Sequence, residues 1–250
     1  MTEENTADAS RALLHFARRR HEKNPTTPVL DAVCDLAPGI REQADEIEAA
    51  RRIPPQLVAQ LATAGVFRML VPRSHGGAQL DLVASMDVLE LLAGADGSVG
   101  WTVWIGAASP LILRPVSPHV FDAIDADGPD VITGGSFTPL GVAEAVDGGY
   151  RVTGQWPFAS GCQHCHWFFV HCAVDDGSDP PLRIMTVPAT EIEIKDTGSV
   201  SGLCGTGSHD SIANDVVDVV TSGPVDTTEL AEQLRDALET AGLPRPQVRV

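Results

Sequence analysis

Positive charge is scarce in this chain. Its 250 residues contain 17 Lys and Arg against 34 Asp and Glu, which gives a formal net charge of -17. The acidic residues are spread along the sequence rather than collected in one tail. Nucleic acids and anionic membrane surfaces attract basic patches, so this balance argues against either as a partner.

Long apolar runs are also lacking. No stretch approaches the roughly 18 apolar residues that suggest a membrane span. Residues 1–28, which include Arg18–Arg20, lack the apolar core of a secretory signal, and we interpret them as a flexible lead-in. The five cysteines are odd in number and lack the dense spacing of a disulfide scaffold. We therefore expect reduced thiols and a cytoplasmic location.

Three common catalytic and nucleotide motifs are absent. The sequence contains neither GxGxxG nor GxxxxGK[ST], so a Rossmann or P-loop nucleotide site has no support. A GxSxG elbow is missing too, and hydrolysis by an activated serine therefore has no anchor.

The first half of the chain has the periodicity of amphipathic helices, with apolar residues three and four positions apart. The segments with this pattern are residues 30–47, 57–64, 82–92 and 98–104. Pro38–Gly39 should kink or split the first helix, Asp81 should cap the third and Ser98 the fourth. We predict a helical domain over residues 29–128.

Beyond Pro129 the pattern becomes that of short strands separated by Gly, Asp and Pro. Asp147–Gly149 predicts a hairpin turn, because glycine adopts positive φ at little steric cost. Further strands are expected at residues 166–174, 182–187, 191–197 and 212–220. The predicted fold class is α+β, with an antiparallel β-barrel or sheet over residues 129–220. Residues 221–250 are expected to form a short tail containing one amphipathic helix.

Cysteine and histidine cluster between residues 162 and 172, and the spacing of Cys162 and Cys165 is that of many zinc sites. On a strand, however, His171 and Cys172 would point to opposite faces, and His166 would lie about 20 Å from Cys172. No second CxxC or HxxxH is present. The CxxC also does not open a helix as a thioredoxin-like redox pair does. We expect strand packing here and no metal site.

The segment Trp156–Gly161 precedes an aromatic strand. One interpretation is an aromatic core of the barrel. The other is a wall for a flat heteroaromatic ring, with an indole edge for apolar contact and a serine hydroxyl and backbone N–H groups for ring nitrogens. Composition leaves both interpretations open.

Several motifs taken together resemble one family. They are Leu70–Pro72 with Gly76–Gly77, Gly97–Trp101, Ser136–Gly141, Val146–Phe158, Ala159–Cys162 with His164–Cys165, and Gly202–Ser208. In this order and spacing, residues 30–220 resemble the acyl-CoA dehydrogenase superfamily, specifically its flavin-dependent monooxygenase branch. The resemblance implies a helical N-terminal domain, a β-barrel and a flavin ring lying against the barrel.

The resemblance also implies a site and a reaction. The serine of the matching motif approaches flavin N5 in that branch, which implies a catalytic role for Ser160. The residues implied to bind the cofactor are Trp101, Ser136, Trp156, Phe158, Ser160 and Gly161. The implied cofactor is reduced flavin, FMN or FAD, supplied by a separate flavin reductase. The implied reaction is the hydroxylation of a small phenolic substrate with O2.

The chain departs from the family in three respects. Ala108–Leu111 lacks a histidine that helps to activate the phenol in relatives, and Cys204 replaces a common arginine. The C-terminal four-helix bundle that follows the barrel is missing. We therefore expect a homo-oligomer or association with a separately supplied helical domain, and a truncated chain that is inactive alone. Two alternatives stay open: an acyl-CoA dehydrogenase-type CH–CH oxidoreductase, and a non-catalytic remnant or interaction module.

Overall fold

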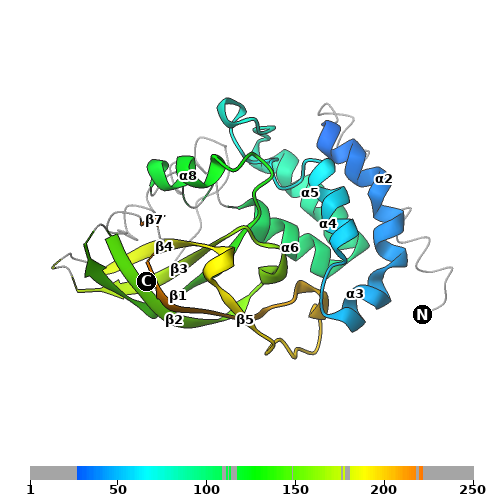
Figure 1. Cartoon of the computed structure of the whole chain (residues 1–250). Helices are drawn as coiled ribbons and strands as arrows, with labels where there is room; N and C mark the ends of the chain where they lie inside the picture. The colour runs from blue at the N-terminus through cyan, green and yellow to red at the C-terminus, as the bar shows by residue number, and fades with distance from the viewer. Residues whose placement is uncertain are drawn as a thin grey trace, which may run out of the picture.

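The computed structural model describes residues 27–108, 111, 113, 117–147, 149–175, 177, 181–217 and 220–221. Helices precede strands along the chain, and Figure 1 shows the two kinds of element side by side. This order confirms the α+β class. Residues 1–26 of the predicted lead-in (residues 1–28) lie outside the described residues. The predicted tail beyond Thr221 also lies outside them.

The helical part begins with a capped helix. Its helices are α2 (Pro28–Glu42), α3 (Ala44–Ala50), α4 (Pro55–Thr63), α5 (Leu82–Ala95) and α6 (Gly97–Ala107), with a 3₁₀ turn η1 (Arg73–His75) before α5. Thr27 Oγ1 accepts the N–H of Leu30 at 3.2 Å, and Asp81 Oδ1 accepts that of Ala84 at 2.8 Å. These bonds satisfy amide groups that the first turn of a helix leaves unpaired. The cap predicted at Asp81 is confirmed.

Two predicted helix features are wrong. Helix α2 continues through Pro38 as far as Glu42, and the break comes at Gln43. Buried Ala37 and Ile40 hold the stretch around Pro38 against the core, which offsets the backbone hydrogen bond that proline cannot make. The cap of α6 is Asp96 rather than Ser98, since the Asp96 carboxylate accepts the Val99 N–H at 2.9 Å.

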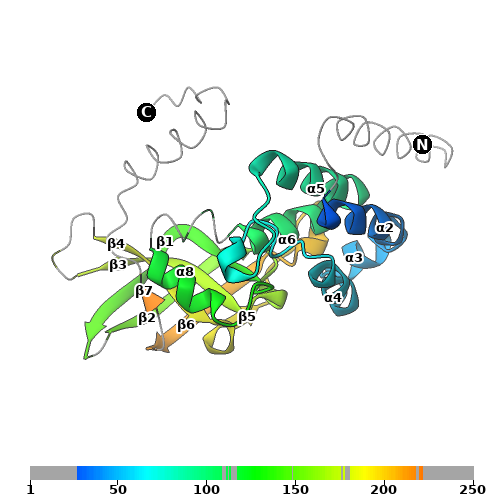
Figure 2. The same cartoon turned by 90° about the horizontal axis from the view of Figure 1, so that it is seen from above.

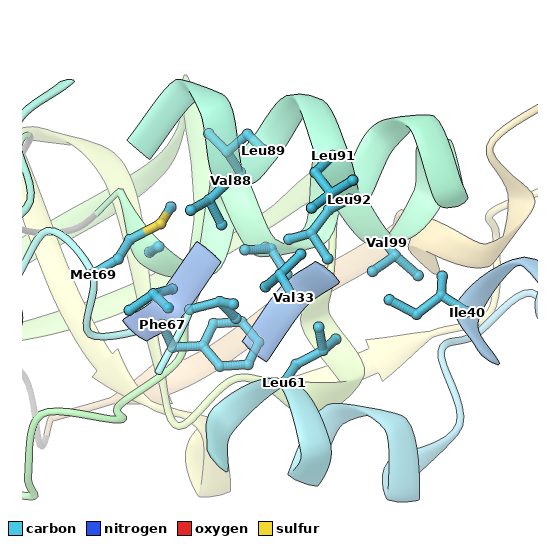
Figure 3. Close-up of a cluster of buried hydrophobic side chains, with 14 of the residues drawn as sticks. Val33, Ile40, Leu61, Phe67, Met69, Val88, Leu89, Leu91, Leu92 and Val99 are labelled. Atoms are coloured by element: carbon cyan, nitrogen blue, oxygen red, sulfur yellow. The ribbon is translucent and has the colours of Figure 1, made fainter. Parts of the chain in front are cut away.

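The helices share one apolar core. Figure 3 shows side chains of α2, α4, α5 and α6 meeting in a single cluster, in which Val33, Ile40, Leu61 and Leu92 are fully buried. Burying one such side chain stabilises the fold by about 1.5–3 kcal/mol before the entropy cost of ordering it. Helix α6 rests closely on α5, because a side chain at Gly100 would meet the Cα of Ala93 at 2.7 Å. This contact fixes the orientation of Trp101, the next residue.

One sheet follows, with strand order β5-β6-β2-β1-β3-β4-β7. The strands are β1 (Thr133–Val146), β2 (Gly149–Ala159), β3 (Trp167–Val174), β4 (Leu182–Pro188), β5 (Glu193–Lys195), β6 (His209–Val216) and β7 (Val220–Thr221). The predicted hairpin is confirmed, since Val146 pairs with Gly149. The strand expected at 191–197 is limited to β5, because Ala189–Glu191 forms a 3₁₀ turn, η3.

The sheet is mixed rather than wholly antiparallel. Strands β1 and β3 are parallel, with Thr133 opposite Trp167, while the other described pairs are antiparallel. The reason is the connection after the hairpin. The chain leaves β2 through the 3₁₀ turn η2 (Cys162–His164) and returns to the start of β1 before β3 begins. Strand β1 therefore lies between β2 and β3.

The two faces of the sheet bury different side chains. Phe168, Val170 and Cys172 of β3 join the core of the sheet, whereas Phe169 packs with Phe121 of helix α8 (Pro118–Asp125). Figure 2 shows α8 lying over the strands. This alternation puts Cys172 in the core of the sheet and His171 on the other side of the strand, as predicted.

The transition from helices to strands falls between the end of α8 at Asp125 and the start of β1 at Thr133. The boundary at residue 128 stays a prediction. Among the described residues, no helix combines the length and apolar character needed to cross a membrane.

Candidate functional site

A hydrogen bond joins the helices to the sheet at Ser160. The indole Nε1 of Trp101, on α6, donates to Ser160 Oγ at 3.0 Å. Ser160 follows β2 directly, and Trp101 is 46% exposed. The structure thus brings together two residues that the sequence predicted for one site, although they are 59 positions apart.

A chain of hydroxyl groups continues from Ser160 into the loop before β6. Ser160 Oγ lies 2.8 Å from Ser208 Oγ, which lies 2.8 Å from Thr206 Oγ1. Thr206 Oγ1 in turn donates to the carbonyl oxygen of Leu203 at 2.7 Å. Thr206 belongs to the 3₁₀ turn η4 (Cys204–Thr206) and is only 4% exposed. Four side chains and one carbonyl therefore form a continuous network.

The backbone N–H groups at this turn are already in use. Gly161 N donates to the Thr206 carbonyl at 2.8 Å, and Ser160 N donates to the Phe158 carbonyl at 2.9 Å. Gly161 has φ +72°, and a side chain there would meet Thr102 Cγ2 at 2.9 Å. Gly161 therefore acts as a tight turn that aims Ser160. The N–H groups of Ser160 and Gly161 are therefore not free in this arrangement, and the role of Gly161 in binding a cofactor stays a prediction.

Exposed apolar side chains occur close to Ser160 in the sequence and on the elements it contacts. Phe158 is 68% exposed and Leu203 is 49% exposed. A side chain at Gly97 would lie 2.8 Å from Leu203 Cδ2, so Leu203 covers the first turn of α6. Trp101 is four residues further along that helix and hence on the same side. We call Trp101, Phe158, Ser160 and Leu203 the Ser160 surface.

Trp156 is not part of this surface. It is fully buried in the core of the sheet, and its Nε1 donates to the His171 carbonyl at 3.2 Å. The prediction that Trp156 contacts the cofactor is therefore wrong for its side chain. For this residue the interpretation as an aromatic core holds.

Ser136 lies on β1, paired with Val170 of β3. Its Oγ accepts the N–H of Thr138 at 3.2 Å. The adjacent Phe137 is 51% exposed and packs against Phe169, with ring centroids 4.9 Å apart. The contribution of Ser136 to a cofactor site stays a prediction.

Burial shifts the pKa values of several cysteines and histidines between residues 162 and 172. Burial raises the pKa of the Cys162 thiol to about 11 and that of Cys172 to about 12. Burial lowers the pKa of His164 to about 4, with the charge of Arg52 adding to the effect. These thiols are therefore protonated at neutral pH, and protonated thiols are weak nucleophiles.

The same cysteines are described by their hydrogen bonding and by their lack of disulfides. Cys162 Sγ donates to the Gly207 carbonyl, with a separation of 3.2 Å. All five cysteines fall within the described residues, and none of them forms a disulfide. The described part of the chain contains no group of three or more potential metal ligands.

The loop that carries Leu203 and Ser208 is anchored on α3. Arg51, which follows α3, donates to Asp196 Oδ2 at 2.6 Å and to the Gly198 carbonyl at 3.2 Å. Its guanidinium lowers the pKa of the Asp196 carboxyl. Glu48 Oε2 accepts the N–H of Cys204 at 3.0 Å. Cys204 therefore anchors the loop through its backbone.

The Ser160 surface fits one face of a flavin ring. A flat heteroaromatic ring needs apolar contact for its carbon framework and a small number of directed polar groups for its nitrogens. Trp101, Phe158 and Leu203 offer the first, and the Ser160 hydroxyl offers the second. A separate hollow of about 440 Å³ lies between α2 and α4, is lined by Asp35, Leu36 and Gln60 among others, and has no such pattern.

Comparisons with known proteins agree with this fold. Residues 31–118 match the family described as acyl-CoA dehydrogenase, N-terminal domain. The crystal structure of the HsaA monooxygenase from Mycobacterium tuberculosis superposes with a TM-score of 0.70 at 34% identity, and the match covers 77% of this chain and 54% of that one.

Two curated relatives narrow the class. The chain is 35% identical over 189 residues to the flavin-dependent monooxygenase, oxygenase subunit HsaA, of M. tuberculosis, which covers 75% of this chain and 48% of that protein. It is 31% identical over 197 residues to the oxygenase component of an FADH(2)-dependent resorcinol hydroxylase from a Rhizobium species, covering 78% and 48%. These matches confirm the resemblance to the flavin-dependent monooxygenase branch of the acyl-CoA dehydrogenase superfamily. The chain spans about half the length of the curated relatives it matches.

Sequence reasoning did not place Leu203, Thr206 and Ser208 in the site. The motif Gly202–Ser208 had been noted only as part of the resemblance. Its two hydroxyl residues, Thr206 and Ser208, are separated only by Gly207, and this pair is the signal that could have indicated a polar network.

Proposed function

We propose that this chain is the flavin-facing part of the oxygenase component of a two-component aromatic hydroxylase. Such a system uses reduced flavin and O2 to hydroxylate a small phenolic substrate, and a separate reductase supplies the flavin. The proposal depends on one observation, the hydrogen bond between Trp101 and Ser160, which positions one hydroxyl group beside exposed apolar side chains. Identity of 31–35% with two oxygenase components supports the proposal.

Each residue of the Ser160 surface has a proposed task. Ser160 hydrogen-bonds N5 of the ring, and Trp101 orients that hydroxyl. Phe158 and Leu203 lie against the ring and exclude water from it. Bound reduced flavin, either FMN or FAD, supplies the oxygen chemistry itself. The protein contributes position and a dry surface.

We further propose that the exposed apolar side chains require a covering partner, either a second copy of this chain or a separately supplied helical domain. Val83, Met86, Phe137, Leu140 and Val142 are each between 47% and 54% exposed. Large exposed apolar patches mark interaction surfaces. If a second copy is the partner, light scattering of the purified chain should show an oligomer. A stable monomer at high concentration would contradict self-association and leave the separately supplied helical domain as the partner.

The experiment for the main proposal is spectroscopic. The purified chain is mixed anaerobically with reduced FMN or FAD, and the flavin spectrum is followed after O2 is added. Slow, protein-dependent reoxidation through a distinct spectral species supports the hydroxylase. Reduction of bound oxidised flavin by an acyl-CoA instead would support the dehydrogenase alternative. Failure to bind any flavin would leave the non-catalytic alternative.

A variant pair tests the assigned residue. Ser160→Ala should shorten the lifetime of that species, because the hydroxyl that holds N5 is gone. Thr153→Ala is the matched control, since Thr153 is an exposed residue of β2, the strand that precedes Ser160, and its hydroxyl bonds Asp215. Equal lifetimes in wild type and Ser160→Ala would remove Ser160 from its role.

A further inference from the structure

The network of hydroxyl groups at Ser160 ends in one group that can only donate and one that can only accept. These two ends fix the direction in which each hydrogen bond of the network is donated. At one end, the indole N–H of Trp101 is a donor only. At the other end, the carbonyl oxygen of Leu203 is an acceptor only. Between these ends lie three hydroxyl groups, each with a single proton to donate.

The direction follows from counting those protons. Thr206 gives its proton to the Leu203 carbonyl at 2.7 Å, so in its 2.8 Å contact with Ser208 it must accept. Ser208 therefore gives its proton to Thr206. In its own 2.8 Å contact with Ser160, Ser208 must then accept.

The proton of Ser160 thus points toward Ser208 and away from the apolar surface. Of the two lone pairs on Ser160 Oγ, one receives the Trp101 N–H. The second lone pair is left for a ligand. The hydroxyl network therefore presents Ser160 to that ligand as a hydrogen-bond acceptor.

We propose that Thr206 and Ser208 are positioning residues that hold Ser160 as an acceptor, and that the site thereby distinguishes reduced from oxidised flavin. This inference rests on the proposed function, since it takes flavin as the ligand. N5 of reduced flavin carries a hydrogen and donates, whereas N5 of oxidised flavin has only a lone pair and accepts. Only reduced flavin, whose N5 donates, can bond a Ser160 hydroxyl that the network holds as an acceptor.

The mismatch with oxidised flavin has a physical cost within the network. To donate to a ligand, Ser160 would have to withdraw its proton from Ser208. Ser208 could then donate either to Ser160 or to Thr206, and the other 2.8 Å contact would hold no proton. Thr206 is only 4% exposed, so water cannot readily replace the lost partner at the Ser208–Thr206 contact, and keeping that contact leaves the Ser160–Ser208 contact without a proton. A lost hydrogen bond of this kind corresponds to about tenfold in affinity.

The test measures the dissociation constants of oxidised and of reduced flavin for the full 250-residue chain, with FMN and FAD each titrated under anaerobic conditions. The wild-type chain should bind the reduced form at least about tenfold more tightly. Ser208→Ala and Thr206→Val each free the Ser160 proton, so either variant should bring the ratio of the two constants close to one. Thr206→Ser keeps the hydroxyl and should restore the wild-type ratio.

Thr153→Ala is again the control, because it removes a hydroxyl from β2 and leaves the hydroxyl network of Ser160, Ser208 and Thr206 intact. Circular dichroism confirms that each variant is folded. An unchanged ratio in Ser208→Ala and Thr206→Val, with flavin still bound, would overturn the inference and leave the proposed function standing. A wild-type chain that binds neither form of flavin would overturn both.

Discussion

The indole of Trp156 reaches from β2 across β1 and donates to the backbone carbonyl of His171 on β3, with an N–O separation of 3.2 Å. It can do so because β1 has Gly141 at the crossing point, where any side chain would collide with the indole ring. Trp156 therefore links β2 to β3 across the intervening strand β1.

Trp156→Phe should therefore lower stability and spare the ligand site. The change removes one buried hydrogen bond and leaves a cavity beside Gly141, for a combined loss of about 2 kcal/mol in the free energy of unfolding. Urea denaturation measures this loss. If flavin affinity fell instead and the urea midpoint stayed the same, Trp156 would be a ligand contact after all.

Trp101 should behave in the opposite way. Trp101→Phe keeps an aromatic ring but loses the N–H that orients Ser160, so we expect affinity for reduced flavin to fall by about threefold to tenfold. Fluorescence titration measures the change. Trp104→Phe, three residues further along α6 and packed against the helical core, serves as the control and should leave affinity unaltered. Equal effects of the two substitutions would show only a general loosening of α6.

Two glycines in helices should respond to alanine with opposite signs. Gly39 in α2 has open space where a side chain would go, so Gly39→Ala should stabilise the protein by roughly 0.5–1 kcal/mol through helix propensity. At Gly100 the new methyl group would meet Ala93 at 2.7 Å and push α6 away from α5. Gly100→Ala should lower the melting temperature and weaken flavin binding as Trp101 moves. A Gly100→Ala protein with unchanged melting temperature would contradict the close packing of these helices.

Acid should destabilise the fold through two partly buried histidines. The pKa of His164 falls from 6.5 to about 4 on folding, chiefly because of burial. Between these values the unfolded chain binds a proton that the folded chain does not, so stability rises with pH and is lost as pH drops from 6.5 toward 4. Burial lowers the pKa of His171 as well.

Melting temperatures across that pH range provide the measurement. His164→Gln should flatten the dependence on pH, and His171→Gln should remove a further part of it. A dependence just as steep in the double variant would assign the acid sensitivity to other groups.

The helices were readable from the sequence because their stripes of apolar residues and their cap at Asp81 are local signals. The hairpin at Asp147–Gly149 was local too. The parallel pairing of β1 with β3 was not, since it depends on where the chain returns after η2 (Cys162–His164). No periodicity encodes that path.

The candidate site was predicted in part for a similar reason. Trp156 and Phe158 are two positions apart, so a regular strand would place both on one face. The register shifts between Trp156 and Ala159, and Phe158 has φ +58°, which turns one ring inward and the other outward. The link from Ser160 to Ser208 joins residues 48 positions apart and could be found only in the folded structure.

That separation in sequence also sets the order in which the residues of the Ser160 hydrogen-bond network can come together. Trp101 emerges first during synthesis, then Ser160, and the donor–acceptor polarity of the network is undefined until Ser208 has joined them and β6 has paired with β2. Contacts this distant in sequence form late and slowly. A nascent chain therefore exposes the apolar side chains of Trp101 and Phe158 before the hydrogen bonds that orient Ser160 are complete, and exposed apolar surface of this kind favours aggregation during folding.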